Sequence, residues 1–600
     1  MRDIRLGQTI APFGVGAIYD YQGESLMLTD VGEWDKTATS RIVSARLESA
    51  LGGAELRTPP SVSSFASEKS AGIPFVRFPS WLFCQDCRRM HRQKRSEETG
   101  ASPACAVCGG AMVPMRFVAV CTKHSHVMDV PWDRWAHSEP TNEDQRKCAL
   151  GGHDLVFEPV PNTSEALSGL RVACLSCRAQ RTLGGITSAD SLRRVGIKCL
   201  GGQPWQFNQP LCDERLEVLQ RGATNVTALE VSSALDIPEV EPCRDELDEG
   251  IESHHLFAYV SSSPDSPLAA ALIATICEEL HVTKEQVIHR LNAQGQPTSP
   301  EKSQTMSLLD AEWDAFKNVM QSSGEDLGHP NFVVTRENVA QYWREHDVGT
   351  LDLVRSVLLV SRLREVRALQ GFRRYRDDSD FVRANLRGGA GRDWMPAIEA
   401  FGEGVFIGFN EDSLKQWESN PVIIARALRL ETRRQKSPIG SRLPVATPRS
   451  LLLHTTSHLL MRQLSFGSGY SAASLRERVY SSDSQAGILI YTASDDTEGT
   501  LGGLVREGEK NRLRGTLIRA LEAASWCSND PVCVESPGQG MNSMNLASCH
   551  ACALSSETSC SRMNLGLDRV LVVGTPDGSV PGFFEDVLHR LRASIAASRA

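Results

Sequence analysis

Residues 526–560 read WCSNDPVCVESPGQGMNSMNLASCHACALSSETSC, and the cysteines in this stretch predict a C-terminal fold that is held by a metal ion. Cys549 and Cys552 form a C-x2-C pair, a spacing that lets both thiolates reach one tetrahedral Zn²⁺ from a tight turn. Cys527 and Cys533 form a looser pair that could supply the other two ligands. The stretch therefore predicts a closed, structural zinc site near the end of the chain.

The segment just upstream predicts a small α/β unit around this site. GILIYTAS, which begins at Gly487, reads as a buried strand, and it is followed by a glycine turn and a helix in GTLGGLVREGEKNRLRGTLIRALEAASW. The turn lacks the Gly-Lys-Ser/Thr ending of a Walker A loop, so the lysine that would contact phosphates is missing. We therefore expect 441–600 to be an α/β zinc-binding domain and the chain not to be a nucleotide-driven motor itself.

The composition is that of an ordinary globular chain. Hydrophobic residues make up 41% and charged residues 23% of the 600 positions, and the net charge of −9 argues against wholesale binding of polyanions. The first residues lack the apolar core of a signal peptide, and no apolar run reaches the roughly 18 residues of a membrane-spanning helix. We expect a cytoplasmic protein with no membrane contact. In a reducing compartment its 17 cysteines indicate metal sites rather than disulfides.

A second cysteine pattern lies near the N-terminal end. Cys84 and Cys87 in VRFPSWLFCQDC and Cys105 and Cys108 in ACAVCGG form two C-x2-C pairs separated by a polar, basic loop. This is the spacing of a zinc ribbon, in which each pair supplies two ligands from a tight turn. With four thiolates on the ion, no position remains open for water or substrate, so the pattern predicts a structural site.

A third C-x2-C pair, Cys174 and Cys177, predicts a second site in the same region. The simplest closed set adds one flanking cysteine on each side, Cys148 and Cys199. Cys121 or a histidine could replace either flank. The histidines of this region are otherwise expected to be hydrogen-bonded core residues.

Arginines concentrate in the middle of the chain. VRSVLLVSRLREVRALQGFRRYR and RALRLETRRQK place them around apolar positions with a spacing that we interpret as helical, within 346–440. Two such clusters in an acidic chain could line a phosphate-binding groove, and the alternative is a helix surface with internal salt bridges. The candidate nucleic-acid contacts are Arg362, Arg364, Arg367, Arg373, Arg374, Arg429, Arg433 and Arg434.

His454 and His458 in HTTSHLL stand at positions i and i+4, the spacing by which metalloprotease helices hold zinc. Position 455 is threonine where that chemistry requires a general-base glutamate, so we expect polar packing on a helix that faces the following sheet. No catalytic residue is predicted. A metal-dependent nuclease or hydrolase that uses this pair, or His124 and His126, is the alternative function.

Several motifs taken together resemble a known family. HTTSHLL, GILIYTASDDTEGTLGGL and the terminal CHAC cluster look like the zinc-binding domain at the C-terminus of MrfA-like helicases. VRFPSWLFCQDC, VAVCTKHSHVMDVPWDRWAH, LQRGATN, SRLREVRALQGF and ASCHACALSSETSC resemble the DrmB family, subunits of the bacterial DISARM anti-phage system. The resemblance covers most of the chain and is weakest over roughly 236–340.

The resemblance implies a function and partners. DrmB-type proteins work with a separate helicase subunit, DrmA, which supplies the ATPase, and together they engage foreign DNA. The family's C-terminal domain binds zinc through four cysteines, which implies Cys527, Cys533, Cys549 and Cys552 here, with Cys560 as an alternate. The expected function is a non-enzymatic, helicase-associated and DNA-binding subunit. An assembly scaffold without DNA contact is a further alternative.

We therefore expect an α+β multidomain protein with three structural Zn²⁺ ions. N-terminal zinc-ribbon-like modules, a helical arginine-rich middle and a C-terminal α/β zinc-binding domain follow one another. The expected segments are an N-terminal contact segment 1–75, a zinc-ribbon region with two sites 76–235, a linker and helical region 236–345, the arginine-rich helices 346–440 and the zinc-binding domain 441–600.

Overall fold

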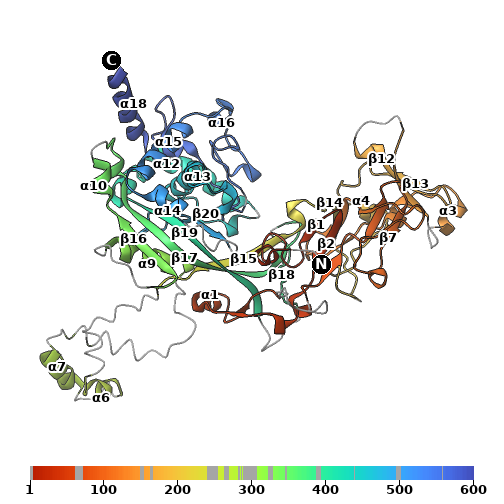
Figure 1. Cartoon of the computed structure of the whole chain (residues 1–600), viewed down its shortest axis with the longest axis horizontal. Coiled ribbons are helices and arrows are strands. Elements are labelled where there is room, and N and C mark those ends of the chain that lie inside the picture. The colour runs from red at the N-terminus through yellow and green to blue at the C-terminus, as the bar shows by residue number, and fades with distance from the viewer. Residues whose placement is uncertain are drawn as a thin grey trace.

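The fold is a mixed α/β architecture, as the sequence predicts. The computed structural model describes residues 4–599 with the exceptions of 61–71, 149–153, 162–165, 208, 239–253, 263–268, 281–283, 285–286, 288–306, 322–328, 345–346, 377, 387–393, 438, 495–501 and 557. Much of the expected linker region 236–345, and the first residues of the glycine turn after GILIYTAS, lie outside the described residues. Strand-rich N-terminal modules lie on one side and a helix-covered sheet on the other (Figure 1).

A nine-stranded sheet among the described residues organises the second half of the chain. Its main path runs in the order β15-β17-β19-β21-β20, and every neighbouring pair on this path is antiparallel. The bounds are β15 Ala228–Leu235, β17 Val354–Arg373, β19 Trp394–Phe409, β20 Leu475–Tyr480 and β21 Gly487–Ser494. The prediction of a strand at GILIYTAS is confirmed by β21.

Further strands join this sheet from distant parts of the chain. β16 and β18 pair with β17, and β4 runs parallel to β19 while also pairing with β3. The bounds are β3 Arg41–Ile42, β4 Glu55–Arg57, β16 Phe332–Glu337 and β18 Val382–Arg383. The sheet therefore takes strands from segments that the sequence assigns to different domains.

The segment 354–373, for which the spacing of arginines and apolar residues predicts a helix, is the 20-residue strand β17, so that prediction is wrong. The cause is burial on both faces. Val357 and Leu359 contact one apolar core, whereas Leu358 and Val360 contact another. A strand covered on both sides is an almost continuous apolar run, and such a run cannot be distinguished from a buried helix by periodicity. The branched valines of this run suit a strand better than a helix.

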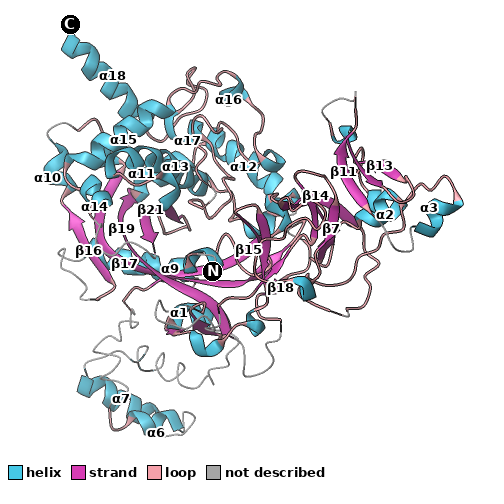
Figure 2. Cartoon of the chain, turned by 45° about the vertical axis from the view of Figure 1, so that its right-hand side comes forward, coloured by secondary structure: helices cyan, strands magenta, loops and turns pink. Residues whose placement is uncertain are grey.

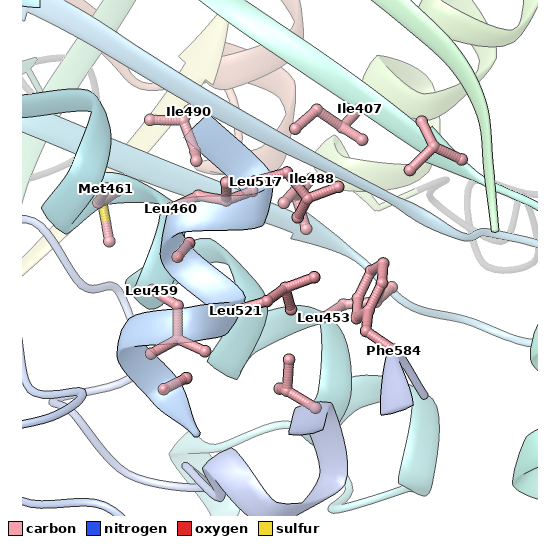
Figure 3. Packing of buried hydrophobic residues seen from close by; sticks show 14 of the residues in the cluster. Ile407, Leu453, Leu459, Leu460, Met461, Ile488, Ile490, Leu517, Leu521 and Phe584 are labelled. Carbon is pink, nitrogen blue, oxygen red and sulfur yellow. The ribbon is translucent and has the colours of Figure 1, made fainter. Parts of the chain in front are cut away.

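Helices cover both faces of the sheet. On one face, Ile407, Ile488 and Ile490 of the strands pack against side chains of α13, α15 and the segment before α18 (Figure 3). On the other face, Phe316 of α9 stacks on Phe406, with ring centroids 4.4 Å apart. The bounds are α9 Leu308–Gln321, α13 Pro448–Ser468, α14 Gly503–Gly508, α15 Asn511–Ala524 and α18 Glu585–Arg599.

Among the described residues, the N-terminal modules are built on four small antiparallel sheets. Several of their strands, β7, β11, β13 and β14, lie to the right in Figure 2. Their orders are β1-β2-β5, β7-β6-β8, β10-β9-β14 and β11-β12-β13. The bounds are β1 Ile18–Tyr21, β2 Glu24–Leu28, β5 Phe75–Arg77, β6 Trp81–Cys84, β7 Met90–Arg92, β8 Met112–Pro114, β9 Phe117–Cys121, β10 Val127–Asp129, β11 Leu155–Pro159, β12 Leu170–Cys174, β13 Gln180–Thr182 and β14 Leu216–Gln220. Small modules of this kind are commonly stabilised by bound metal.

Among the described residues, the remaining α-helices are short apart from α7 and α12. The second arginine-rich segment forms α12, Pro421–Lys436, as predicted. The others are α1 Ala45–Ala50, α2 Trp132–Ala136, α3 Glu143–Cys148, α4 Ser191–Arg194, α6 Phe257–Ser262, α7 Ala269–Leu280, α10 Val339–Trp343, α11 Glu411–Glu418, α16 Val532–Glu535 and α17 Arg569–Val573. In the part of the chain that is described, no helix combines the length and apolar character needed to cross a membrane.

Candidate metal centres and the arginine clusters

The four cysteines of the predicted ribbon meet at one point. The sulfur of Cys84, at the end of β6, lies 3.4 Å from that of Cys108, and the sulfurs of Cys87 and Cys105 are 3.6 Å apart. All four sulfurs lie within 4.8 Å of one another. These separations are close to the edges of a tetrahedron of thiolates around Zn²⁺, for which bonds of about 2.3 Å give edges of about 3.8 Å.

The turns that present the two C-x2-C pairs of the ribbon have the same local geometry. The residue after the second cysteine is left-handed, with φ of 62° at Arg88 and 75° at Gly109, and its N–H donates to the carbonyl of the first cysteine. The third pair repeats this geometry at Arg178, with φ of 62° and an N–H that donates to the carbonyl of Cys174 at 2.8 Å. This local turn explains why C-x2-C spacing brings two sulfurs to one ion.

The ribbon thiols influence one another's ionisation. Backbone N–H groups of Cys108 and Val107 lower the pKa of Cys105 to about 6. At Cys108 the N–H of Gly110 lowers the pKa, but the neighbouring thiols of Cys84 and Cys87 outweigh it and raise the value to about 12. Four adjacent thiols can therefore all ionise at neutral pH only if a cation compensates their charge.

The second predicted site is assembled from Cys148, Cys174, Cys177 and His137. The sulfurs of Cys148 and Cys174 are 3.7 Å apart, and the Nε2 atom of His137 lies 3.3 Å from the sulfur of Cys177. The Nδ1 atom of His137 lies 2.8 Å from the carbonyl of Asp133, so Nδ1 carries the proton and Nε2 can coordinate a metal. His137 therefore occupies the place expected for Cys199.

Cys199 lies in a separate cluster with Cys121, His126 and Cys212. Its sulfur is 3.4 Å from Nδ1 of His126, and its backbone forms a bridge with Cys212. The predicted grouping of Cys199 with the third C-x2-C pair is thus corrected, because the chain turns Cys199 toward β9, which ends at Cys121. Cys121, an expected alternate of the other site, belongs here.

Three residues of these clusters were absent from the predicted ligand sets: His126, His137 and Cys212. Cys212 had no partner at short spacing, so the sequence offered no local signal for it. For the two histidines the sequence favours a place in the core, because a single histidine is more often a hydrogen-bonded core residue than a ligand. The available signal was the number of ligands, since two histidines, four unpaired cysteines and the third C-x2-C pair complete two sets of four.

The terminal cysteines converge as the spacing predicts. The sulfurs of Cys527 and Cys549 are 3.5 Å apart, and those of Cys533 and Cys552 are 3.8 Å apart. The side-chain amide of Asn529 donates to the sulfur of Cys549 at 3.3 Å, which stabilises a thiolate. The expected alternate, Cys560, is not part of this group and lies against His454 instead.

The histidine pair considered for a hydrolase is fully enclosed. The side chains of His454 and His458 are 0% exposed, and both Nε2 atoms lie within 3.3 Å of Glu477. His124 lies 3.3 Å from the sulfur of Cys212, at the edge of the Cys199 cluster. A substrate phosphate has no access to the buried pair in this conformation, so the geometry does not favour hydrolysis there.

Most of the candidate DNA-binding arginines of the first cluster are engaged inside the protein. Arg364 pairs with Asp236 at 2.8 Å and also with Glu399. Arg374 is 1% exposed, and its guanidinium donates to the carbonyls of Val226 and Gly16, both at 2.9 Å. Two more pairs link Arg367 to Glu365 at 2.8 Å and Arg373 to Glu230 at 2.6 Å.

The remaining candidates differ in exposure. Arg434 pairs with Glu431 at 2.8 Å, and Arg433 donates to the carbonyls of Pro537 and Ser543. Arg362 and Arg429 are exposed. The guanidinium of Arg362 lies 5.4 Å from the ring centroid of Phe401. Of the eight candidates, these last two have the accessibility that contact with a phosphate backbone requires.

Two family models match the parts of the chain that contain the clusters. The family model described as a domain of unknown function (DUF8724) matches residues 5–228, which include the three N-terminal clusters. The family model described as the MrfA Zn-binding domain matches residues 456–553, which include all four cysteines of the terminal cluster. The C-terminal region is therefore a zinc-binding domain.

A full-length relative identifies the family. The DISARM protein DrmB of Bacillus paralicheniformis is 30% identical over 599 residues, covering 95% of this chain and 100% of the relative. The chain belongs to the DrmB family. As a DrmB-family protein it carries several cysteine-rich clusters with metal-binding geometry, one of them inside the zinc-binding domain.

Proposed function

We propose that this DrmB-family chain is a non-catalytic subunit of a DISARM anti-phage defence complex, which binds a DrmA-type helicase and helps it engage DNA. The observation that carries the proposal is the similarity to the DISARM protein DrmB over 95% of the chain. In this assignment the helicase supplies ATP hydrolysis. This chain supplies a zinc-stabilised surface for the helicase and for DNA.

The cysteine-rich clusters support a structural role for the metal. Each of the four described above offers four ligand atoms within 4.8 Å of one another. A tetrahedral Zn²⁺ with four protein ligands has no open position for a water nucleophile. We propose one Zn²⁺ in each of these clusters, which exceeds the three ions expected from the sequence.

The turn before α14 is also unsuited to a nucleotide. The carboxylate of Glu403 accepts the N–H groups of Leu504 at 2.9 Å and Val505 at 3.2 Å, and the hydroxyl of Tyr470 at 2.8 Å. These first N–H groups of a helix are the donors that a phosphate would use. Because the carboxylate of Glu403 already occupies these donors, we infer that the chain relies on its partner for ATP hydrolysis.

The surface around the terminal cluster suits a protein partner. Trp526 and Val532 each precede a cysteine of the cluster, and they are 65% and 76% exposed. Exposed tryptophan is typical of protein interfaces, where a large apolar ring supplies much of the binding energy. We assign this surface to the helicase, and the exposed Arg362 and Arg429 to DNA.

Co-purification tests the assignment. The chain and the helicase subunit of the same system are expected to elute as one complex, with ATP hydrolysis by the helicase or the complex and none by this chain alone. ATP hydrolysis by the isolated chain, or the absence of any complex, would contradict the proposal. A complex whose DNA affinity equals that of the helicase alone would instead identify this chain as an assembly scaffold.

A further inference from the structure

Four side chains with metal-binding atoms meet beneath α13, apart from the cysteine-rich clusters. His454 and His458 come from α13, Glu477 comes from β20, and Cys560 comes from the loop after the terminal cysteines. The two histidines and Glu477 have side chains that are 0% exposed, and Cys560 is 6% exposed. His454 and Cys560 lie outside residues 456–553, the part matched by the zinc-binding family.

The ligand atoms are spaced as around a single ion. The Nε2 atoms of His454 and His458 lie 3.1 Å and 3.3 Å from Oε1 of Glu477, and Nε2 of His454 lies 3.3 Å from the sulfur of Cys560. Tetrahedral zinc with bonds of about 2.0 to 2.3 Å separates its ligand atoms by about 3.3 to 3.8 Å. The observed separations are close to this range.

The hydrogen bonds of the histidines determine which nitrogen faces the centre. Nδ1 of His458 lies 2.9 Å from the carbonyl of Ala553, and Nδ1 of His454 lies 3.4 Å from the carbonyl of Gly566. A carbonyl only accepts, so each Nδ1 carries a proton, and the neutral ring presents an Nε2 lone pair to Glu477. This is the orientation of histidines that bind metal through Nε2, with a backbone carbonyl behind each ring.

Cys560 is positioned as a thiolate. Its sulfur accepts the backbone N–H groups of Arg562 and Asn564, both at 3.3 Å, and such donors favour the charged form. The other carboxylate oxygen of Glu477 accepts the hydroxyl of Ser457, which leaves Oε1 directed at the histidines. The guanidinium of Arg562 donates to Ser450 at 2.9 Å.

The metal-bound and metal-free states of this cluster differ in their buried charge. Two neutral imidazoles, one carboxylate and one thiolate carry two negative charges in a buried space, which a divalent cation neutralises. Without a metal, at least one Nε2 atom would need a proton to face the carboxylate oxygen, and a buried imidazolium ion carries a large desolvation cost. The backbone carbonyls behind both rings and the N–H groups on the thiolate favour the metal-bound state.

We propose that His454, His458, Glu477 and Cys560 bind a fifth Zn²⁺ in a closed, structural site. The ion would join α13 to β20 and to the loop that follows the terminal cluster. Cys552 is a member of the terminal cluster, and the carbonyl of the next residue, Ala553, orients His458. Cys560, eight residues after Cys552, supplies the last ligand of the new site. One loop would thus run between two zinc ions and stabilise the surface that we assign to the helicase.

Zinc content of the full-length chain tests the site. Cys560→Ala is expected to lose about one zinc ion per chain by mass spectrometry of the purified protein, and Glu477→Gln is expected to bind that ion more weakly during dialysis against a chelator. Cys277→Ala is the matched control, because Cys277 lies on α7 and belongs to none of the five clusters. Full zinc content in a folded Cys560→Ala variant would overturn the proposal.

A measurement on the unaltered chain guards against variants that fail to fold. In anomalous difference maps at the zinc absorption edge, a peak is expected between Nε2 of His454 and the sulfur of Cys560, in addition to peaks at the four cysteine-rich clusters. Peaks at those four clusters with no peak here would overturn this site while leaving the proposed function intact.

Discussion

The Nε2 atom of His137 lies 3.3 Å from the sulfur of Cys177, where the spacing of cysteines predicted Cys199. His137 and Cys199 therefore belong to different metal clusters. His137→Ala and Cys199→Ala are each expected to remove about one zinc ion per chain, and the double variant about two. Elemental analysis of the purified chains measures this. His91→Ala, an exposed histidine paired with Glu97, is the control. A double variant that loses only one ion would restore the predicted grouping.

The terminal cluster and the surface beside it are expected to respond differently to substitution. Cys549→Ala removes a ligand, so it should release zinc and lower the free energy of unfolding by about 3 kcal/mol or more. Trp526→Ser should keep the zinc and change stability by no more than about 0.5 kcal/mol, but weaken helicase binding at least about tenfold. Calorimetric titration with the helicase measures the second effect, and unchanged affinity would remove Trp526 from the interface.

Two arginines of β17 provide a matched pair for DNA binding. Arg362→Glu is expected to lower the DNA affinity of the complex and reduce the slope of log affinity against log salt by about 0.9, with the fold unchanged. Arg364→Glu should instead destabilise the chain by roughly 3 kcal/mol, because it leaves Asp236 and Glu399 without their cation. Fluorescence anisotropy over a salt series separates the two. An unaltered slope for Arg362→Glu would favour a scaffold without DNA contact.

Arg374 connects three parts of the chain through buried hydrogen bonds. Its guanidinium contacts the carbonyls of Gly16 and Val226 and the side chain of Gln203, so Arg374→Met leaves buried acceptors unsatisfied. We expect a loss of roughly 3 kcal/mol in the free energy of unfolding. The exposed Arg376, substituted in the same way, should change it by less than about 0.5 kcal/mol. Denaturant unfolding compares the variants, and equal effects would contradict this role.

The sequence predicts those metal ligands whose positions depend on local structure. The C-x2-C pairs were identified because a tight turn alone brings two sulfurs together, as the left-handed residues Arg88 and Arg178 show. The identity of the other ligands depends on tertiary structure. Cys212 reaches Cys199 through a backbone bridge that closes the loop between them, and His137 depends on the end of α2.

The middle of the chain could not be predicted from local pattern for a related reason. β17 is buried on both faces, which removes the alternation that identifies a strand. The role of its arginines depends on partners far away in the sequence. Arg364 pairs with Asp236, 128 positions earlier, so composition alone could not distinguish an internal ion pair from a phosphate contact.

The most direct test of the proposed function is the DNA affinity of the helicase with and without this chain, measured over a range of salt concentrations. We predict tighter binding in the presence of the chain and a steeper salt dependence, because exposed arginines of this subunit add phosphate contacts. An identical affinity and slope, measured with a complex that has been verified to form, would contradict the claim that this subunit helps the helicase engage DNA.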